Sequence, residues 1–229
     1  MSRKTVARYV RSIMSLPYKF TLGFLLSAGL KLNYFDYFPY PWPPKTPARY
    51  YISQFIETYY GDISGHCVEF FPSYYQDWLK KSGRITTYDV WNVEEAESVT
   101  IVGDLQYAPH ISHNTFDTVI CTQVLMCIAR PWEAVDELYR IVAPGGLVLC
   151  TNPVIVGKYQ PHPNDYWRFT KASMEVLFSK FSRIEIHSYG NAATVAGSSQ
   201  FLTNHQYPKS VLDWHDEACP SIVAIAAWK

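Results

Sequence analysis

The stretch that decides the fold spans residues 116–150 and reads FDTVICTQVLMCIARPWEAVDELYRIVAPGGLVLC. It begins with an apolar run over 116–121, which predicts a buried strand. Residues 131–142 follow with a proline in the first turn and apolar side chains at helical spacing, so they predict an amphipathic helix. The Pro-Gly-Gly sequence at 144–146 ends that helix, and a second apolar run follows at 147–150. Two buried strands joined by an amphipathic helix are typical of a parallel sheet.

The alternation of strands and helices continues on both sides of this unit. Further strands are expected at 66–71, 84–89, 99–102, 183–187 and 222–226, and further helices at 48–60, 73–81 and 170–181. The strands are too apolar to face water on one side, which predicts helices on both faces of the sheet. We therefore expect an α/β fold with a Rossmann-like, mostly parallel sheet at 61–229, preceded by an N-terminal extension at 1–60.

Composition narrows the class of protein. The chain has 229 residues, of which 48% are hydrophobic, 16% aromatic and only 17% charged, so a disordered chain is excluded. Lys plus Arg and Asp plus Glu both number 20, so no basic field predicts a nucleic-acid partner. The five cysteines are spread out without zinc-like spacing, which predicts no metal site and a reducing, cytoplasmic compartment. No secretory signal is expected, and the apolar stretch at 20–30 is too short to cross a bilayer.

The N-terminal extension differs from the rest of the chain. No acidic residue precedes Asp36, whereas residues 1–35 contain six lysines and arginines, and a stretch rich in aromatic residues and proline follows at 34–44. One interpretation is a helical lid on the main domain, with its aromatic residues lining a substrate pocket. The other is a cationic arm over residues 1–35 that contacts a membrane surface or a partner protein.

Acidic residues are expected at the edge of the sheet where ligands bind. In open α/β sheets this edge is formed by the carboxyl ends of the strands. Asp89 lies 20 residues after Glu69 and is expected to close the second strand, where a carboxylate grips a ribose diol. Asp104 is expected to close the third strand, where it could accept a hydrogen bond from the exocyclic amine of a purine.

At this point the sequence resembles a known family. Residues 116–125, Pro131 and residues 137–149 are similar to the late motifs of class I S-adenosylmethionine-dependent methyltransferases, and most similar to their type 11 branch. Residues 103–110 and 165–170 resemble a subgroup often linked to glycan and glycosyltransferase systems. The resemblance covers roughly 65–229. It implies a seven-stranded sheet with an antiparallel last strand, and S-adenosyl-L-methionine as the cofactor.

The first motif of the family is degenerate in this chain. The family places glycines after the acidic residue of the first strand, where they let the backbone approach the methionine end of the cofactor. Here that stretch reads Glu-Phe-Phe-Pro-Ser over 69–73, and no glycine occurs between Gly65 and Gly83. A Cβ at such a turn would collide with the ligand or with the required φ. Either the loop takes another path and the cofactor still binds, or the pocket is filled.

The resemblance assigns a cofactor role to eight residues. Glu69, Phe71 and Ser73 would belong to the first loop, Asp89 would hold the ribose, Asp104 and Leu105 would flank the adenine, and Thr122 and Gln123 would line the inner wall. Two alternatives stay open. Glu69 could instead cap the helix expected at 73–81, and Thr122 and Gln123 could cap the element that follows their strand.

The catalytic candidates lie in the loop after the fifth strand. Methyl transfer to an alcohol is helped by a general base, and His162, Asp165 and Tyr166 lie in a stretch dense in proline and aromatic residues. In one interpretation this loop binds the acceptor, with His162 or Asp165 as the base. In the other the loop is structural, with Asp165 paired to Arg168.

Three functions follow from these patterns. The first is methylation of a hydroxyl or similar group on a small molecule or glycan, such as a lipid-linked sugar or a secondary metabolite. The second is a degenerate methyltransferase fold that acts as a binding module or as a non-methylating enzyme, which the loop at 69–73 favours. The third is a peripheral-membrane accessory protein that works through residues 1–35. Asp89 and Asp104 favour the first function.

Overall fold

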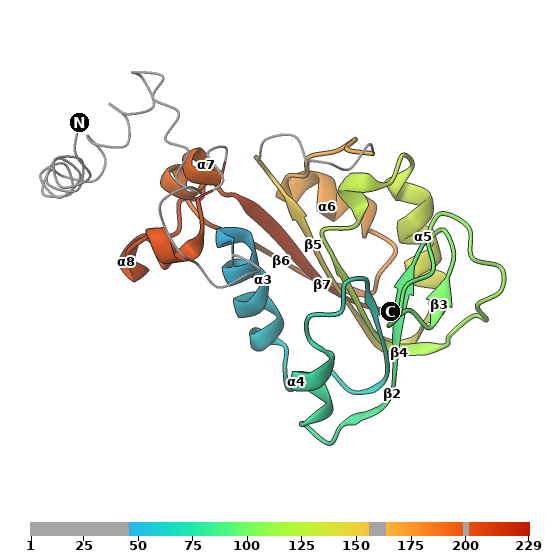
Figure 1. The fold of residues 1–229 in the computed structure, drawn as a ribbon. Coiled ribbons are helices and arrows are strands. Elements are labelled where there is room, and N and C mark those ends of the chain that lie inside the picture. The colour runs from blue at the N-terminus through green and yellow to red at the C-terminus, as the bar shows by residue number, and fades with distance from the viewer. Residues whose placement is uncertain (1–45, 156–163, 199–201) are drawn as a thin grey trace, which may run out of the picture.

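A seven-stranded sheet forms the centre of the computed structural model, which describes residues 46–155, 164–198 and 202–229 (Figure 1). The strands are β1 (Gly65–Phe70), β2 (Ile85–Asn92), β3 (Ile101–Val102), β4 (Phe116–Thr122), β5 (Val142–Pro153), β6 (Arg183–Tyr189) and β7 (Ile222–Trp228). Their order across the sheet is β3-β2-β1-β4-β5-β7-β6. Strands β1 to β5 pair in parallel, whereas β7 is antiparallel to both β5 and β6. The expected Rossmann-like sheet with an antiparallel last strand is confirmed.

Helices cover both faces of the sheet, as expected. They are α3 (Pro47–Thr58), α4 (Gln76–Lys80), α5 (Pro131–Ile141), α6 (Lys171–Leu177), α7 (Ala192–Ser198) and α8 (Lys209–Leu212), with short 3₁₀ turns at Leu125–Cys127 and Asn204–Gln206. In Figure 1, α5 and α6 lie against one face and α3 and α4 against the other, while α7 and α8 lie beyond the end of β6. The helix between β1 and β2 is only five residues long.

Helix α5 shows how the sequence specifies one of these elements. Pro131 occupies the first turn, where no backbone donor is needed, and Glu133 and Arg140 lie at the ends of the helix where their charges oppose its dipole. The buried side chains Ala134, Val135, Leu138 and Ile141 form one stripe. This stripe fixes the helix against the sheet.

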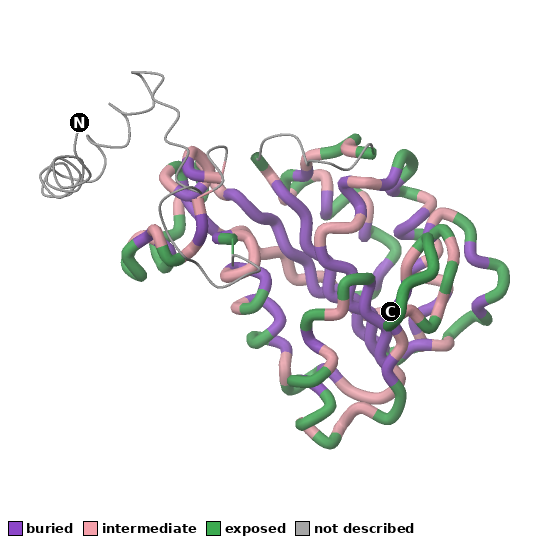
Figure 2. Tube along the Cα trace, viewed as in Figure 1, coloured by how far each residue is buried: buried purple, intermediate pink, exposed green. Residues whose placement is uncertain are grey.

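Two hydrophobic cores lie on the two faces of the sheet. One core includes Val68, Phe116, Val148 and Phe178, between the sheet and the helices α5 and α6. The other core brings three fully buried side chains of α3 against the sheet, namely Ile52, Phe55 and Ile56. Figure 2 shows that the central strands are almost entirely buried. The part of the N-terminal extension that the structure describes therefore packs on the main domain, whereas the cationic arm at 1–35 lies outside the described residues.

The cysteines lie mostly inside these cores. Cys67, Cys121 and Cys150 are fully buried, and all five cysteines are free thiols. Cys121 and Cys150 face each other on the neighbouring strands β4 and β5. Burial raises the pKa of the Cys67 and Cys121 thiols. They therefore pack as small apolar side chains.

Two features are absent from the described residues. No group of three His, Cys, Asp or Glu side chains is placed to hold a metal ion in these parts of the chain. Among the same residues no helix has the length and hydrophobicity needed to span a bilayer.

Candidate functional site

The strand order marks the carboxyl end of β1 as the candidate ligand-binding edge. Strand β1 pairs with β2 on one side and with β4 on the other, so the direction of the chain connections reverses at this point. In doubly wound sheets ligands bind at this point, beyond the carboxyl ends of the strands. The residues at this edge are the ends of β1 to β5 and the residues that follow them, at 70–73, 92–94, 103–105, 122–123 and 152–155.

Glu69 is a buried anchor beneath this edge. Its carboxylate is fully buried and accepts hydrogen bonds from the Ser73 hydroxyl at 2.9 Å, the Tyr74 and Tyr75 backbone N–H groups at 2.8 and 3.2 Å, and the Tyr88 hydroxyl at 2.5 Å. The two backbone donors lie just before α4. This geometry corresponds to the capping alternative for Glu69, and it also shapes the loop at the carboxyl end of β1.

The two phenylalanines of this loop lie in different surroundings. The Phe70 ring is buried in the core and stacks on the Trp91 ring, with centroids 5.1 Å apart and planes 21° apart. The Trp91 indole N–H donates to the Gly103 carbonyl at 2.8 Å, which ties the ends of β2 and β3 together. Phe71, in contrast, is 41% exposed. The buried ring is thus part of the core, and the Phe71 ring lies at the surface.

Asp89 does not close the second strand, so this prediction is wrong in position. Strand β2 continues for three residues to Asn92, and Asp89 pairs with Val68 inside the sheet. One carboxylate oxygen lies 2.6 Å from His66 Nε2 and the other accepts from the Thr100 hydroxyl at 2.7 Å. The apolar residues Val90 and Trp91 extend the strand past the acid, and both oxygens of Asp89 already have partners.

Asn92 takes the place at the end of the strand. The register pairs Phe70 with Trp91, so Asn92 lies beside Phe71 at the carboxyl edge. The Asn92 side-chain amide donates to the Glu94 backbone carbonyl at 3.0 Å. The Asn92 backbone carbonyl accepts from the Gly103 N–H at 2.9 Å. Sequence reasoning missed Asn92, because only the register reveals where the strand ends.

Asp104 and Leu105 lie where the sequence predicts them, after β3. The exposed Asp104 carboxylate accepts from the Gln106 backbone N–H at 2.8 Å and from the Gln106 side-chain amide at 2.9 Å, whereas Leu105 is buried. The Gln106 carbonyl oxygen in turn accepts from the Arg130 N–H at 3.0 Å. Asp104 is therefore held in place yet open to solvent.

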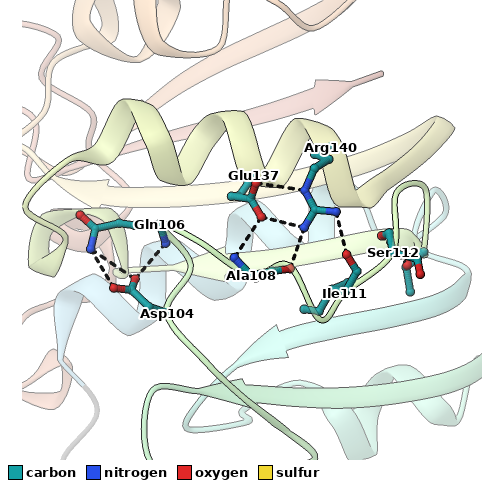
Figure 3. A network of polar contacts seen from close by, with 8 residues as sticks. Asp104, Gln106, Ala108, Ile111, Ser112, Glu137 and Arg140 are labelled. Carbon is teal, nitrogen blue, oxygen red and sulfur yellow. Dashed lines mark hydrogen bonds and ion pairs between the residues drawn. The ribbon is translucent and has the colours of Figure 1, made fainter.

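The loop that carries Asp104 is fixed to α5 by two charged side chains (Figure 3). Arg140 donates to the carbonyls of Ile111 at 2.7 Å and Ala108 at 2.8 Å, and Glu137 accepts from the Ala108 N–H at 3.2 Å. Arg140 and Glu137 also pair with each other at 2.7 Å. The Arg140 hydrogen bond lowers the pKa of Glu137, so the pair stabilises the fold until the pH falls through that lowered value.

Replacing Arg140 by methionine should loosen this loop, because two carbonyls and a carboxylate lose their donor. We expect a loss of about 2–3 kcal/mol in the free energy of unfolding, measured by urea denaturation, and faster amide hydrogen exchange over residues 105–111. Arg130→Met is the matched control. Arg130 makes an exposed pair with Glu133 on the same helix, and its removal should cost about 0.5 kcal/mol or less. Equal effects of the two substitutions would contradict the fixing role.

Thr122 and Gln123 lie at the end of β4, as predicted. Gln123 has φ of 60°, in the left-handed region that residues with side chains rarely adopt. Its backbone N–H donates to the Thr151 carbonyl at 2.7 Å, and its amide reaches the Thr151 hydroxyl at 3.3 Å. Thr122 is buried beside it. Strained backbone of this kind clusters at ligand sites, which makes Gln123 the strongest structural marker of this edge.

The loop after β5 contains the Asp165–Arg168 ion pair, which is the structural alternative that the sequence predicts for this loop. Both oxygens of Asp165 accept from the Arg168 guanidinium, at 2.6 and 3.0 Å, and the Asp165 side chain is only 5% exposed. The backbone N–H groups of Tyr166 and Trp167 both donate to the Met126 carbonyl. Asp165 is thus engaged in holding the loop. His162 lies outside the described residues.

Exposed aromatic side chains gather at this loop. Trp132 in the first turn of α5 is 50% exposed, Tyr166 53% and Trp167 38%. The Trp132 and Trp167 rings meet edge to face, with centroids 6.3 Å apart, and the Trp167 indole donates to the Ala129 carbonyl. These three residues form the aromatic rim. No signal in the sequence marks Trp132, because an aromatic residue in a helix does not by itself indicate which ring it contacts.

Beyond β6, Asn191 has a structural role. Its side chain is fully buried, and its amide donates to the carbonyls of Val211 and Trp214, both at 2.7 Å. Its carbonyl oxygen accepts from the N–H groups of Ala193 and Thr194, at 3.0 and 3.1 Å. Asn191 therefore caps α7 and attaches it to the segment around α8.

Comparison with protein families gives one match. Residues 65–150, from β1 into β5, match a family described as "Methyltransferase domain". Comparison with curated proteins gives no significant match.

Comparison with solved structures gives the same fold. A SAM-dependent methyltransferase from Archaeoglobus fulgidus superposes with a TM-score of 0.55 at 11% identity, over 80% of this chain and 94% of that one. The phosphoethanolamine N-methyltransferase 2 of Haemonchus contortus, in complex with phosphomonomethylethanolamine and S-adenosylhomocysteine, gives 0.54 at 15% identity, over 80% and 53%. The [4+2]-cyclase SpnF gives 0.50 at 15% identity, over 79% and 80%. The fold is that of the class I methyltransferases.

Proposed function

We propose that this chain, which carries a methyltransferase domain over residues 65–150, is an S-adenosylmethionine-dependent methyltransferase acting on a hydroxyl of a sugar-bearing acceptor. The observation that carries the proposal is the agreement of two independent findings. The domain match covers β1 to β5, and these strands occur in the order and direction of the class I methyltransferase sheet. The domain match and the methyltransferase neighbours support an S-adenosylmethionine-dependent enzyme.

The donor set at the edge fits an adenosyl group. The exposed Asp104 carboxylate can accept from an adenine amine, and buried Leu105 offers an apolar flank beside it. Asn92 at the end of β2 can donate to and accept from a ribose hydroxyl. Gln123 and Thr122 form the wall toward β4. When bound, the cofactor supplies an electrophilic methyl group on a sulfonium.

The acceptor is proposed to lie against the aromatic rim. Exposed rings of Trp132, Tyr166 and Trp167 can pack against the apolar face of a sugar while its hydroxyls stay hydrated. Methyl transfer then needs alignment of the hydroxyl, exclusion of water and removal of one proton. With Asp165 held by Arg168, His162 is the residue we propose as the general base.

A second function is favoured by the loop at 69–73. It lacks glycine, and Phe71 and Pro72 stand at the turn where backbone would approach the cofactor. The fold is also that of SpnF, which is named a [4+2]-cyclase. A binding module or a non-methylating enzyme built on this fold is therefore the alternative.

Calorimetry with S-adenosylmethionine and S-adenosylhomocysteine separates the two functions. The same measurement on two variants of the protein identifies the residue that binds the ribose. We expect both ligands to bind the wild-type protein with micromolar affinity. Asn92→Leu should weaken binding about tenfold, because it removes the polar groups at the end of β2. Asp89→Asn is the matched control within the same strand and should change affinity less than about twofold, because Asp89 is paired inside the sheet.

Each result of this experiment decides a point. Absence of heat and of a thermal shift with either ligand would reject the methyltransferase function in favour of the alternative. A large loss of affinity with Asp89→Asn and no loss with Asn92→Leu would show that Asp89, and not Asn92, binds the ribose.

A further inference from the structure

We propose that Arg49, in the first turn of α3, binds the carboxylate of the methionine moiety of the cofactor. This inference rests on the proposed function, since it assigns one more residue to the same site. It gives the described part of the N-terminal extension a role in ligand binding.

Arg49 lies beside the loop that follows β1. Its guanidinium carbon is 3.7 Å from the centre of the Tyr74 ring. It is also near the hydroxyl of Tyr75, where burial raises the pKa and the cation opposes that shift. Tyr74 and Tyr75 are the residues whose N–H groups bind Glu69. Arg49 therefore stands next to the glycine-free loop, on the face of the sheet covered by α3 and α4.

One nitrogen of the Arg49 guanidinium has no acceptor among the described residues. Arg49 Nη1 is buried and makes no hydrogen bond, and no ion pair involves Arg49 in the part of the chain that the structure describes. The first turn of α3 contains no acidic residue, so the positive end of the helix dipole adds to this charge. A buried N–H group of a guanidinium without an acceptor is costly, and a ligand that supplies an acceptor to Nη1 removes that cost.

The chemistry of the guanidinium selects the ligand. Its planar fork binds a carboxylate or a phosphate through two parallel hydrogen bonds. If the ribose lies at the end of β2, its 5′ substituent points toward the first turn after β1. In S-adenosylmethionine that substituent is the methionine moiety, whose only anionic group is the α-carboxylate. Arg49 then supplies a charged contact at the turn where glycine backbone is absent.

The test compares two cofactors that differ only in this group. Isothermal titration of the full chain with S-adenosylmethionine and with decarboxylated S-adenosylmethionine measures the contribution of the carboxylate directly. We expect the wild-type protein to prefer the carboxylated form by at least about tenfold. Arg49→Met should weaken S-adenosylmethionine about tenfold and change the affinity for the decarboxylated form less than about twofold. Arg49→Lys, which keeps the charge without the fork, should give an intermediate loss.

Controls separate this inference from folding and from the proposed function. Arg183→Met removes an exposed arginine at the opposite edge of the sheet and should leave both affinities unchanged. Circular dichroism and thermal unfolding identify a variant that fails to fold, in which case Arg49→Lys alone decides. Equal weakening of both ligands by Arg49→Met, or no weakening, would overturn the role of Arg49 while the methyltransferase function stands. Binding of neither ligand to the wild-type protein would reject both.

A last arm tests the other anion that suits a guanidinium. Inorganic phosphate is titrated into the protein saturated with S-adenosylmethionine. We expect no heat that depends on Arg49, because the carboxylate already occupies it. Phosphate binding that persists in the saturated protein and disappears in Arg49→Met would assign the residue to an acceptor phosphate and overturn the inference.

Discussion

Replacing Glu69 by alanine should destabilise the protein by about 3–5 kcal/mol, one of the two largest single-residue effects that we expect. The side chain is fully buried and accepts from four donors, so its removal leaves two hydroxyls and two backbone N–H groups without an acceptor. Urea denaturation followed by far-ultraviolet circular dichroism measures this loss. Because the two N–H groups belong to the loop after β1, binding of S-adenosylhomocysteine should weaken as well.

Two other substitutions define what Glu69 contributes. Glu69→Gln keeps the shape and one acceptor oxygen but turns an N–H₂ group toward donors, so about half of the loss should remain. Glu95→Gln alters an exposed acid in the loop after β2 and should stay within about 0.5 kcal/mol of the wild type. An unfolding midpoint for Glu69→Ala equal to that of Glu95→Gln would show that the anchor is dispensable.

The second large effect should come from Asn191→Ala, with a loss of about 3 kcal/mol. This substitution deprives two carbonyls and two N–H groups of their partner at once, on both sides of the connection between α7 and α8. Loss of a helix cap adds to the effect. The measurement is urea denaturation, together with limited proteolysis of the segment 192–214, which should become the first cleaved.

Asn191→Asp tests the two halves of this contact separately. An aspartate keeps the oxygen that caps α7 but places a carboxylate against the carbonyls of Val211 and Trp214. We expect it to destabilise by an amount similar to alanine, with α7 intact and the α8 segment released. Protection of the α8 segment at wild-type level in Asn191→Asp would contradict the role of the amide.

The sequence predicts most helices and strands well, because the residue patterns that mark them lie within each element. Helix α5 is found to within one residue, since proline, charged ends and an apolar stripe agree. The buried strands are found because continuous apolar runs mark them. The sequence does not predict helix α7, since the small residues at 192–198 have no apolar period, and the side chain of its capping residue Asn191 is held by carbonyls 20 and 23 residues away.

The site was harder to predict, because it depends on register and on partners distant in sequence. An acid in a strand looks the same whether it ends the strand or pairs inside it, so Asp89 was misplaced by three residues. Asp165 and Arg168 are only three residues apart, so the sequence predicts their pairing as one of two alternatives. The left-handed backbone of Gln123 has no signature in the sequence, and neither has the Arg49 Nη1 atom, which lacks an acceptor among the described residues.

The reactivity of Cys121 and Cys150, which face each other on β4 and β5, measures how often the centre of the sheet opens. Both thiols are buried in the native state and therefore inaccessible to an alkylating reagent. Burial also raises the pKa of the Cys121 thiol, which makes its reactive thiolate scarce. Their modification by iodoacetamide therefore requires β4 and β5 to separate. The alkylation rate at these two positions, read by mass spectrometry, reports how often the middle of the molecule opens, whereas the half-buried Cys127 and Cys219 report local fluctuations.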